Sequence, residues 1–110
     1  MSRYEIAGRD PTQSVAFGWD RPLGKFFVSV LALPQDPSGE EMEVIEVWME
    51  PTTFNAWELT VLAHRYGDMG EANPLNTFDR LCSDAGISNR YTPKAHEYAR
   101  VRAKREGVLQ

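Results

Sequence analysis

Residues 14–33 read SVAFGWDRPLGKFFVSVLAL, two apolar runs on either side of the short segment Asp20 to Gly24. In the first run, Val15, Phe17 and Trp19 alternate with small residues, and this period of two is typical of a β-strand. The second run is rich in β-branched and aromatic side chains, which favour strands. The segment between them contains proline and glycine, which commonly form tight turns. Residues 14–33 therefore predict a β-hairpin.

The segments on both sides of this hairpin predict two more strands. Tyr4 to Ala7 is a short extended candidate for an edge strand, and a turn over Gly8 to Pro11 follows it. Leu33 to Gly39 has the proline and glycine density of a loop, and Met42 to Met49 predicts the next strand. Since consecutive strands with short connections usually pair with each other, we expect an antiparallel meander.

The last of these strands is apolar on both faces. Strict alternation places Ile45, Val47 and Met49 on one face. The other face then carries Met42, Val44, Glu46 and Trp48. A sheet covered on one side needs only one apolar face, so we expect a helix or the N-terminal strand to bury the second side as well. The alternative is that Trp48 and Val44 belong to a homodimer or partner interface.

From Pro51 onwards the apolar period changes to about 3.6 residues, which indicates helices. The first helix should end at Gly67, since glycine commonly follows the last helical residue. The second helix has clearer ends, with Asn73 as the N-cap, Pro74 at the first helical position and Gly86 just past its end.

Strands followed by helices predict a single α+β domain over residues 1–110. The strands fall within about residues 3–50 and the helices within about residues 53–106. The predicted architecture is an antiparallel meander of three to four strands followed by two to three helices packed on one face.

Composition places the chain among globular proteins, with 42% hydrophobic and 25% charged residues in 110. The single cysteine, Cys82, excludes a disulfide within the chain. No apolar run approaches the roughly 20 residues of a membrane span, and the polar N-terminal sequence lacks the apolar core of a signal peptide. We expect a cytoplasmic protein that does not enter a membrane.

Charge is unevenly distributed along the chain. Residues 90–106 contain six basic and two acidic side chains, a local charge of +4. Since the whole chain carries −4, the remaining residues carry −8. Such a separation can indicate an electrostatic partner surface. The alternative is that the basic segment packs on the acidic body of the same chain or is simply solvated.

Residue types that carry chemistry are present but not in reactive patterns. Glu58 precedes His64 by six residues, and the neighbours His96 and Glu97 point apart on a helix, so neither pair resembles the ligand spacing of zinc helices. Cys82 lies on the apolar stripe of the second predicted helix, where a buried and unreactive thiol is expected. No glycine-rich nucleotide loop occurs. We therefore expect a protein that is not an enzyme, with no metal and no cofactor.

An acidic run in and around the last predicted strand is the strongest candidate for a binding surface. Edge strands often carry charges that prevent pairing with other chains, and this is one explanation of the run. The other is a negative stripe presented to a basic partner. At the tip of the hairpin, Arg21 could stack over Trp19. The candidate partner-binding residues are Glu41, Glu43, Glu46, Trp48, Trp19 and Arg21.

A third helix, with Thr92 as N-cap and Pro93 at the first position, should run to about residue 105. Its basic side chains, interleaved with Tyr91 and Tyr98, are the alternative binding site, which would contact nucleic acid. An overall pI near 5.1 repels a polyanion, so nucleic acid is the less favoured partner. The basic candidates are Lys94, Arg100, Arg102, Lys104 and Arg105.

The hairpin also resembles a known sequence pattern. Residues Gly18 to Leu23 followed by Phe26 and Phe27 are similar to the GWD-x-PL-x-x-FF opening hairpin of a group of small bacterial proteins. The resemblance covers residues 14–31. It implies a similar hairpin and a bacterial or mobile-element source, such as a phage or plasmid, and it implies no activity.

These observations predict a small protein that acts by binding another macromolecule. The expected partner is a protein, which could present a basic nucleic-acid-binding surface, and a homodimer is a further alternative. Short acidic bacterial proteins of this kind include inhibitors of defence complexes, such as anti-CRISPR proteins, and this comparison rests on fold and charge alone. The alternative function is an accessory protein that binds nucleic acid with the basic C-terminal helix.

Overall fold

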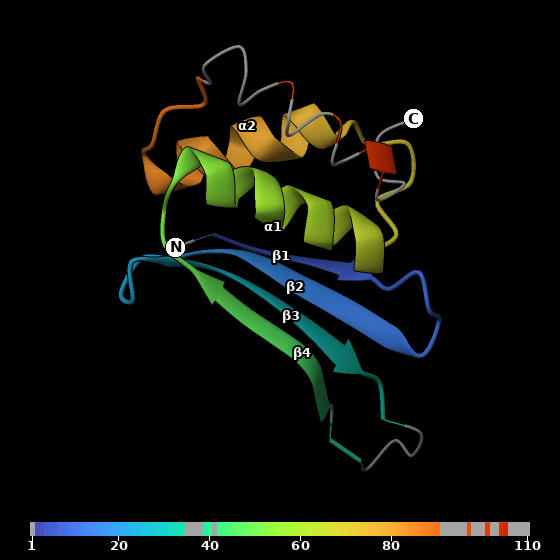
Figure 1. Cartoon of the computed structure of the whole chain (residues 1–110). Helices are drawn as coiled ribbons and strands as arrows, with labels where there is room; N and C mark the ends of the chain where they lie inside the picture. Colours follow the sequence, from blue (N-terminus) through green and yellow to red (C-terminus); the bar gives the residue numbers. More distant parts are fainter. Residues whose placement is uncertain are drawn as a thin grey trace.

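The structure is a computed structural model and describes residues 2–34, 39–40 and 42–90, together with Glu97, Val101, Lys104 and Arg105. Four antiparallel strands are followed by two helices (Figure 1), which confirms the predicted α+β fold and its meander. The elements are β1 (Ser2–Ala7), β2 (Gln13–Asp20), β3 (Lys25–Ala32), β4 (Met42–Met49), α1 (Thr53–Tyr66) and α2 (Pro74–Ala85).

The hairpin formed by β2 and β3 lies at the centre of the sheet, whose strand order is β1-β2-β3-β4. Asp20 at the end of β2 is directly opposite Lys25 at the start of β3. The turn closes with a hydrogen bond of 2.8 Å from the amide of Gly24 to the carbonyl oxygen of Asp20. Gly24 has a φ of 63°, the left-handed conformation that glycine adopts without strain. β1 and β4 are the two edge strands.

Capping residues define the ends of both helices. The hydroxyl of Thr52 accepts a hydrogen bond of 3.1 Å from the amide of Asn55, which caps the first turn of α1. α1 ends before Gly67 as predicted. In α2, the side-chain oxygen of Asn73 accepts from the amide of Leu75 at 3.0 Å. The predicted end of α1 and the predicted N-cap and C-terminal glycine of α2 are therefore confirmed.

The hydrophobic core lies between the two helices and one face of the sheet. Both helices lie on the same side of the sheet (Figure 1) and pack chiefly on β2 and β3. Within the helix layer, Trp57 of α1 meets Phe78 of α2 edge-on, with 5.5 Å between ring centroids. The sheet contributes the buried side chains Val15, Phe17, Phe26, Val28 and Val30.

The second face of the sheet is open in the described part of the chain. The expectation that a helix or the N-terminal strand covers it is wrong, because β1 lies within the sheet beside β2 and both described helices occupy one side. The connection over residues 67–73 is short, so α2 stays in the same layer as α1. As a result Val44 is 52% exposed and Trp48 is 40% exposed.

The predicted third helix falls mostly outside the described residues. Glu97, Val101, Lys104 and Arg105 are helical and exposed. Thr92 and the other residues of this segment lie outside the described part of the chain. Among the described residues, no helix is long and apolar enough to span a membrane.

Candidate partner-binding surface

The edge strand β4 carries exposed apolar and acidic side chains next to each other. We define the β4 surface as Met42, Glu43, Val44, Glu46 and Trp48. Of its apolar members, Met42 is 70% exposed, Val44 52% and Trp48 40%. Side chains on the opposite face of β4, such as Val47, are only partly buried, because the helices pack mainly on the two central strands. β4 is therefore the least covered element of the sheet.

A β-bulge brings Glu43 and Glu46 to one side of the sheet. Ile45 lies opposite Val30, but the next residue of β3, Leu31, lies opposite Glu43 because Val44 is the extra residue. Strict alternation along the strand would have separated Glu43 from Glu46.

The bulge also corrects one predicted position. The prediction that Met42 shares a face with Glu46 is wrong. Met42 lies opposite Ala32, and alternation along β3 places Ala32 on the helix side with Val30. The sequence pattern could not show this, because a bulge depends on the pairing with the neighbouring strand.

The two carboxyl groups interact directly. A hydrogen bond with the Glu46 carboxyl group, together with the repulsion between the two negative charges, raises the pKa of Glu43. Glu46 also accepts a hydrogen bond of 2.8 Å from the indole N–H of Trp48. The β4 surface thus holds an oriented indole ring beside two carboxylates that repel each other when both are ionised.

A row of side chains across the open face supports this edge. In the register of the sheet, Arg3, Gly18, Phe27 and Trp48 lie side by side on consecutive strands. Phe27 is only 4% exposed although it lies outside the helix-covered core. The ring of Trp48 lies 5.5 Å from the Phe27 centroid, and the Arg3 guanidinium lies 5.8 Å from it. Phe27 and Arg3 are not among the binding candidates predicted from the sequence. Alternation along the strand does place Phe27 on the face opposite to that of Phe26.

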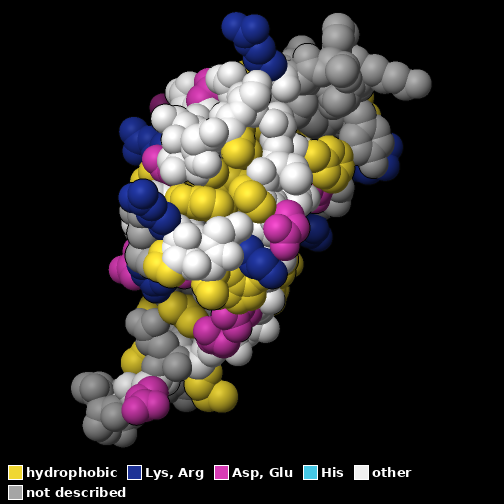
Figure 2. Space-filling view, turned by 90° about the vertical axis from the view of Figure 1, so that its left-hand side faces the viewer, with side chains coloured by type: hydrophobic (Ala, Val, Ile, Leu, Met, Phe, Trp, Pro, Cys, Tyr) yellow, Lys and Arg dark blue, Asp and Glu magenta, His cyan; other side chains and the backbone are white. Residues whose placement is uncertain are grey.

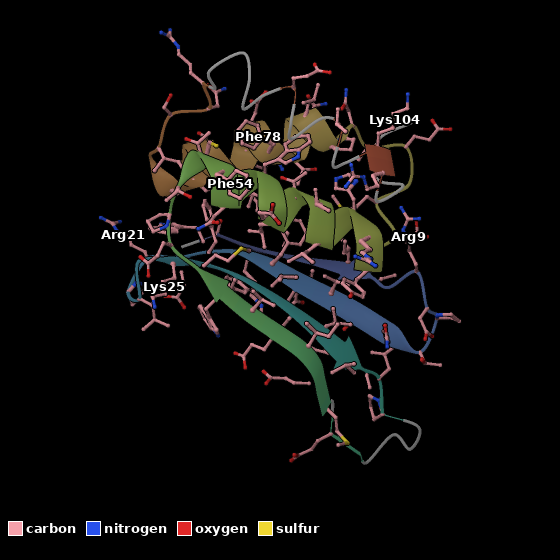
Figure 3. All side chains as sticks on the ribbon, in the orientation of Figure 1. Arg9, Arg21, Lys25, Phe54, Phe78 and Lys104 are labelled. Carbon is pink, nitrogen blue, oxygen red and sulfur yellow. The ribbon has the colours of Figure 1, made fainter. Side chains whose placement is uncertain are left out.

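The other candidate residues do not join the β4 surface. Trp19 lies on the helix-covered side, edge-on to Phe26 with 5.5 Å between ring centroids, so the sheet separates it from Trp48. Arg21 is exposed at the turn between β2 and β3, near Lys25 (Figure 3). Between these described residues no stacking of Arg21 over Trp19 is found. Alternation with Val15 and Phe17 accounts for the inward position of Trp19.

Charges outside the β4 surface are arranged as follows. Lys25 lies 3.5 Å from Glu50, so one carboxylate after β4 has a cationic neighbour. Viewed from the end that carries the β2–β3 turn, hydrophobic and acidic side chains adjoin one another over the sheet, in the lower half of Figure 2. Lys104 and Arg9 lie toward the opposite end of the molecule in Figure 3. Glu41, Lys94, Arg100 and Arg102 lie outside the described residues.

Two groups with reactive side chains are buried in the helix layer. His64 Nε2 lies 2.9 Å from the hydroxyl oxygen of Thr77, and burial, with a smaller effect of Arg9, lowers the pKa of His64. Cys82 is buried as predicted, and burial raises the pKa of its thiol to about 11. Across the described residues, no group of three or more histidine, cysteine, aspartate or glutamate side chains could hold a metal ion.

Comparison with known proteins found no matching family model, no matching curated protein and no matching solved structure. The resemblance of the hairpin to small bacterial proteins therefore stays a prediction.

Proposed function

We propose that this protein acts by binding another protein through the β4 surface. The observation that carries this proposal is an uncovered edge strand on which the exposed side chains of Val44 and Trp48 lie close to Glu43 and Glu46, with Met42 exposed on the other face of the same strand. Apolar patches bordered by polar groups are typical of protein interaction sites. Tryptophan is enriched among the interface residues that contribute most to binding.

The charge of this surface favours a basic partner. The hydrogen bond with Glu46, followed by the repulsion between the two charges, raises the pKa of Glu43. A lysine or arginine placed beside them would favour the ionised form of both groups. Oppositely charged surfaces also associate faster and exclude partners of the wrong charge.

The same carboxylates disfavour pairing of β4 with a second copy of itself. In an antiparallel pair centred near Ile45, acidic residues of one copy would lie opposite or diagonal to those of the other. Like charges at these positions destabilise a sheet. A different protein is therefore favoured over a homodimer through this edge, and measurement of the molar mass in solution distinguishes the two.

The class of partner that fits best is a protein with a basic nucleic-acid-binding surface. The chain has a net charge of −4, and its carboxylates are concentrated outside the basic C-terminal segment. An acidic surface can compete with the phosphates of a nucleic acid for such a partner. The charge of the β4 surface supports an acidic inhibitor of a nucleic-acid-processing or defence complex in a bacterial or mobile-element setting, similar in principle to anti-CRISPR proteins.

The proposal is tested by reversing the charge of the β4 surface. The wild-type protein should retain a partner protein from nuclease-treated lysate of the native host. The variant that carries both Glu43→Lys and Glu46→Lys should not retain this partner. The matched control carries Glu71→Lys and Glu97→Lys, two exposed acidic positions outside the sheet with the same total change of charge. Equal thermal unfolding of all three proteins excludes misfolding. Retention of the same proteins by the β4 variant would refute the proposal.

Nucleic-acid binding is the second candidate, supported by the exposed helical positions of Lys104 and Arg105. It predicts binding to a random DNA duplex that weakens steeply as salt is raised, because phosphate contacts release counterions. Replacement of Arg100, Lys104 and Arg105 by alanine should then abolish binding. Salt-independent or absent binding would remove this candidate.

A further inference from the structure

The open face of the sheet contains a hollow beside the β4 surface. Its volume is about 340 Å³, at the lower end of the range of ligand pockets. The floor is formed by the small side chains of Ser14 and Ala16 on β2. Taller side chains on the neighbouring strands form the walls, with Glu5 on β1 and Leu31 on β3. We call this space the open-face hollow.

The register of the sheet explains why the hollow lies here. Ser14 and Ala16 are two residues apart on β2 and therefore point to the same face. Leu31 lies opposite Ser14, and Glu5 lies opposite Ala16 on the other side. Two small side chains between larger ones leave a trough at the end of the sheet that carries the β1–β2 connection. Leu31 also lies opposite Glu43, so the trough adjoins the β4 surface.

The lining combines an apolar wall with negative charge at the rim. The partly exposed Leu31 offers apolar contact, whereas the side chain of Glu5 is 69% exposed. Glu5 pairs with Arg3 at 2.8 Å, and an exposed pair of this kind contributes little to stability. Glu5 can therefore exchange Arg3 for another cation at small cost. Glu43 and Glu46 add negative charge on the side of β4.

These features match a long side chain with an apolar stem and a positive end. An anionic group would be repelled by the rim carboxylates, and a purely apolar group would gain nothing from their charge. Lysine and arginine bury their methylene groups on apolar surfaces while the charged end stays near water or a carboxylate. Hydrogen bonds between such a cation and a carboxylate are stronger than those between neutral groups.

We propose that the open-face hollow receives a lysine or arginine side chain of the partner protein, with its stem on Ser14 and Leu31 and its charge beside Glu5. This inference rests on the proposed function and names the side chain that anchors the partner. Anchor residues that fill a pocket commonly dominate the affinity of an interface.

The test uses a defined probe, a labelled peptide in which arginine alternates with valine, and a second peptide with citrulline in place of arginine. Citrulline has nearly the shape of arginine but no charge. Wild type should bind the arginine peptide at least about tenfold more tightly. Ser14→Leu, which fills the hollow, and Glu5→Gln, which removes the rim charge, should each weaken binding by about tenfold. Ser83→Leu adds the same apolar side chain at an exposed position of α2 and serves as the control.

The outcomes separate this inference from the proposed function. The backbone amide signals of Ala16 and Leu31 in the nuclear magnetic resonance spectrum should change position when the arginine peptide is added. In one outcome, peptide binding is lost with Glu43→Lys and Glu46→Lys but unchanged by Ser14→Leu and Glu5→Gln. This result would refute the hollow as the arginine site and leave the charged β4 surface as the binding site. Equal binding of the two peptides, or no binding of either, would also overturn the hollow, while the lysate experiment decides the proposed function independently.

Discussion

The two faces of the sheet are built from the same four strands but meet different surroundings. On one face Phe26 is buried beneath the helices, whereas its neighbour Phe27 on the other face is covered by Trp48 and Arg3. Tryptophan shows the same contrast, since Trp57 in α1 is 1% exposed and Trp48 in β4 is 40% exposed. Strand propensity is alike on both faces, so the position of the helices separates the core from the candidate binding surface.

This contrast assigns different roles to the two faces. Side chains on the covered face remove apolar area from water in the isolated molecule and therefore stabilise its fold. The exposed apolar side chains of β4 can remove their area from water only when something else covers them. Substitutions on the two faces should therefore differ in their effect on the free energy of unfolding.

The largest expected effect breaks the covered face. Trp57→Ala should lower the free energy of unfolding by about 3–5 kcal/mol, because it leaves a cavity between α1, α2 and the sheet. Trp48→Ala should cost less, about 1–2 kcal/mol, because Trp48 is 40% exposed and its removal loses the contact with Phe27 without opening a cavity beneath the helices. Urea unfolding followed by circular dichroism measures both. Similar losses for the two variants would contradict the assignment of the core to one face.

A smaller effect is expected at the centre of the open face. Gly18 has a φ of 155°, and a Cβ placed there would lie 2.2 Å from the carbonyl oxygen of Ser2. Gly18→Ala should therefore push β1 away from β2 and cost about 3 kcal/mol. Gly24→Ala is the matched comparison. Gly24 also has a positive φ, of 63°, but no atom lies within 4 Å of the added carbon, so only the backbone conformation is strained.

Gly24→Ala should cost only about 1 kcal/mol. Chemical denaturation of the two glycine variants under the same conditions provides the comparison. An equal loss at Gly18 and Gly24 would show that the close approach of β1 is not what requires glycine at position 18.

The smallest effect concerns the charge of His64 within the helix layer. Folding lowers the pKa of His64 from its usual value of 6.5, so the folded state favours the neutral ring. This stabilisation is present above pH 6.5 and is lost as the pH falls through the lower pKa of the folded state. Acidification from about pH 7.5 to about pH 5.5 should therefore reduce the free energy of unfolding.

His64→Gln should remove this part of the pH dependence, and His96→Gln serves as the matched control because it replaces the second histidine of the chain. Unfolding free energies at several pH values provide the measurement. If the pH dependence persists in His64→Gln and disappears in His96→Gln, His96 and not His64 is its source.

Local signals predicted most of the fold correctly. The turn before Gly24, the cap at Asn73 and the glycine after α2 each fix the backbone within a few residues, so the ends of these elements can be read without knowledge of the rest. The burial of Cys82 was also predicted, because a helical stripe of apolar residues must face the core.

The candidate surface was only partly predictable. Glu43, Glu46 and Trp48 were selected from composition, and Trp19 was selected although its place in the strand pattern already pointed to the side of Val15 and Phe17. The contact between Glu43 and Glu46 depends on the bulge at β4. The open-face hollow depends on three strands at once, so no pattern within one strand predicts it.

The sequence by itself determined the strands, the helices, their ends and the uneven distribution of charge, because each depends on interactions between residues close together along the chain. The tertiary structure alone decided which face of the sheet is covered, which acidic groups meet and where the hollow lies. These features depend on how separate strands align and on which side the helices pack. Such choices are made by contacts between residues far apart in the sequence.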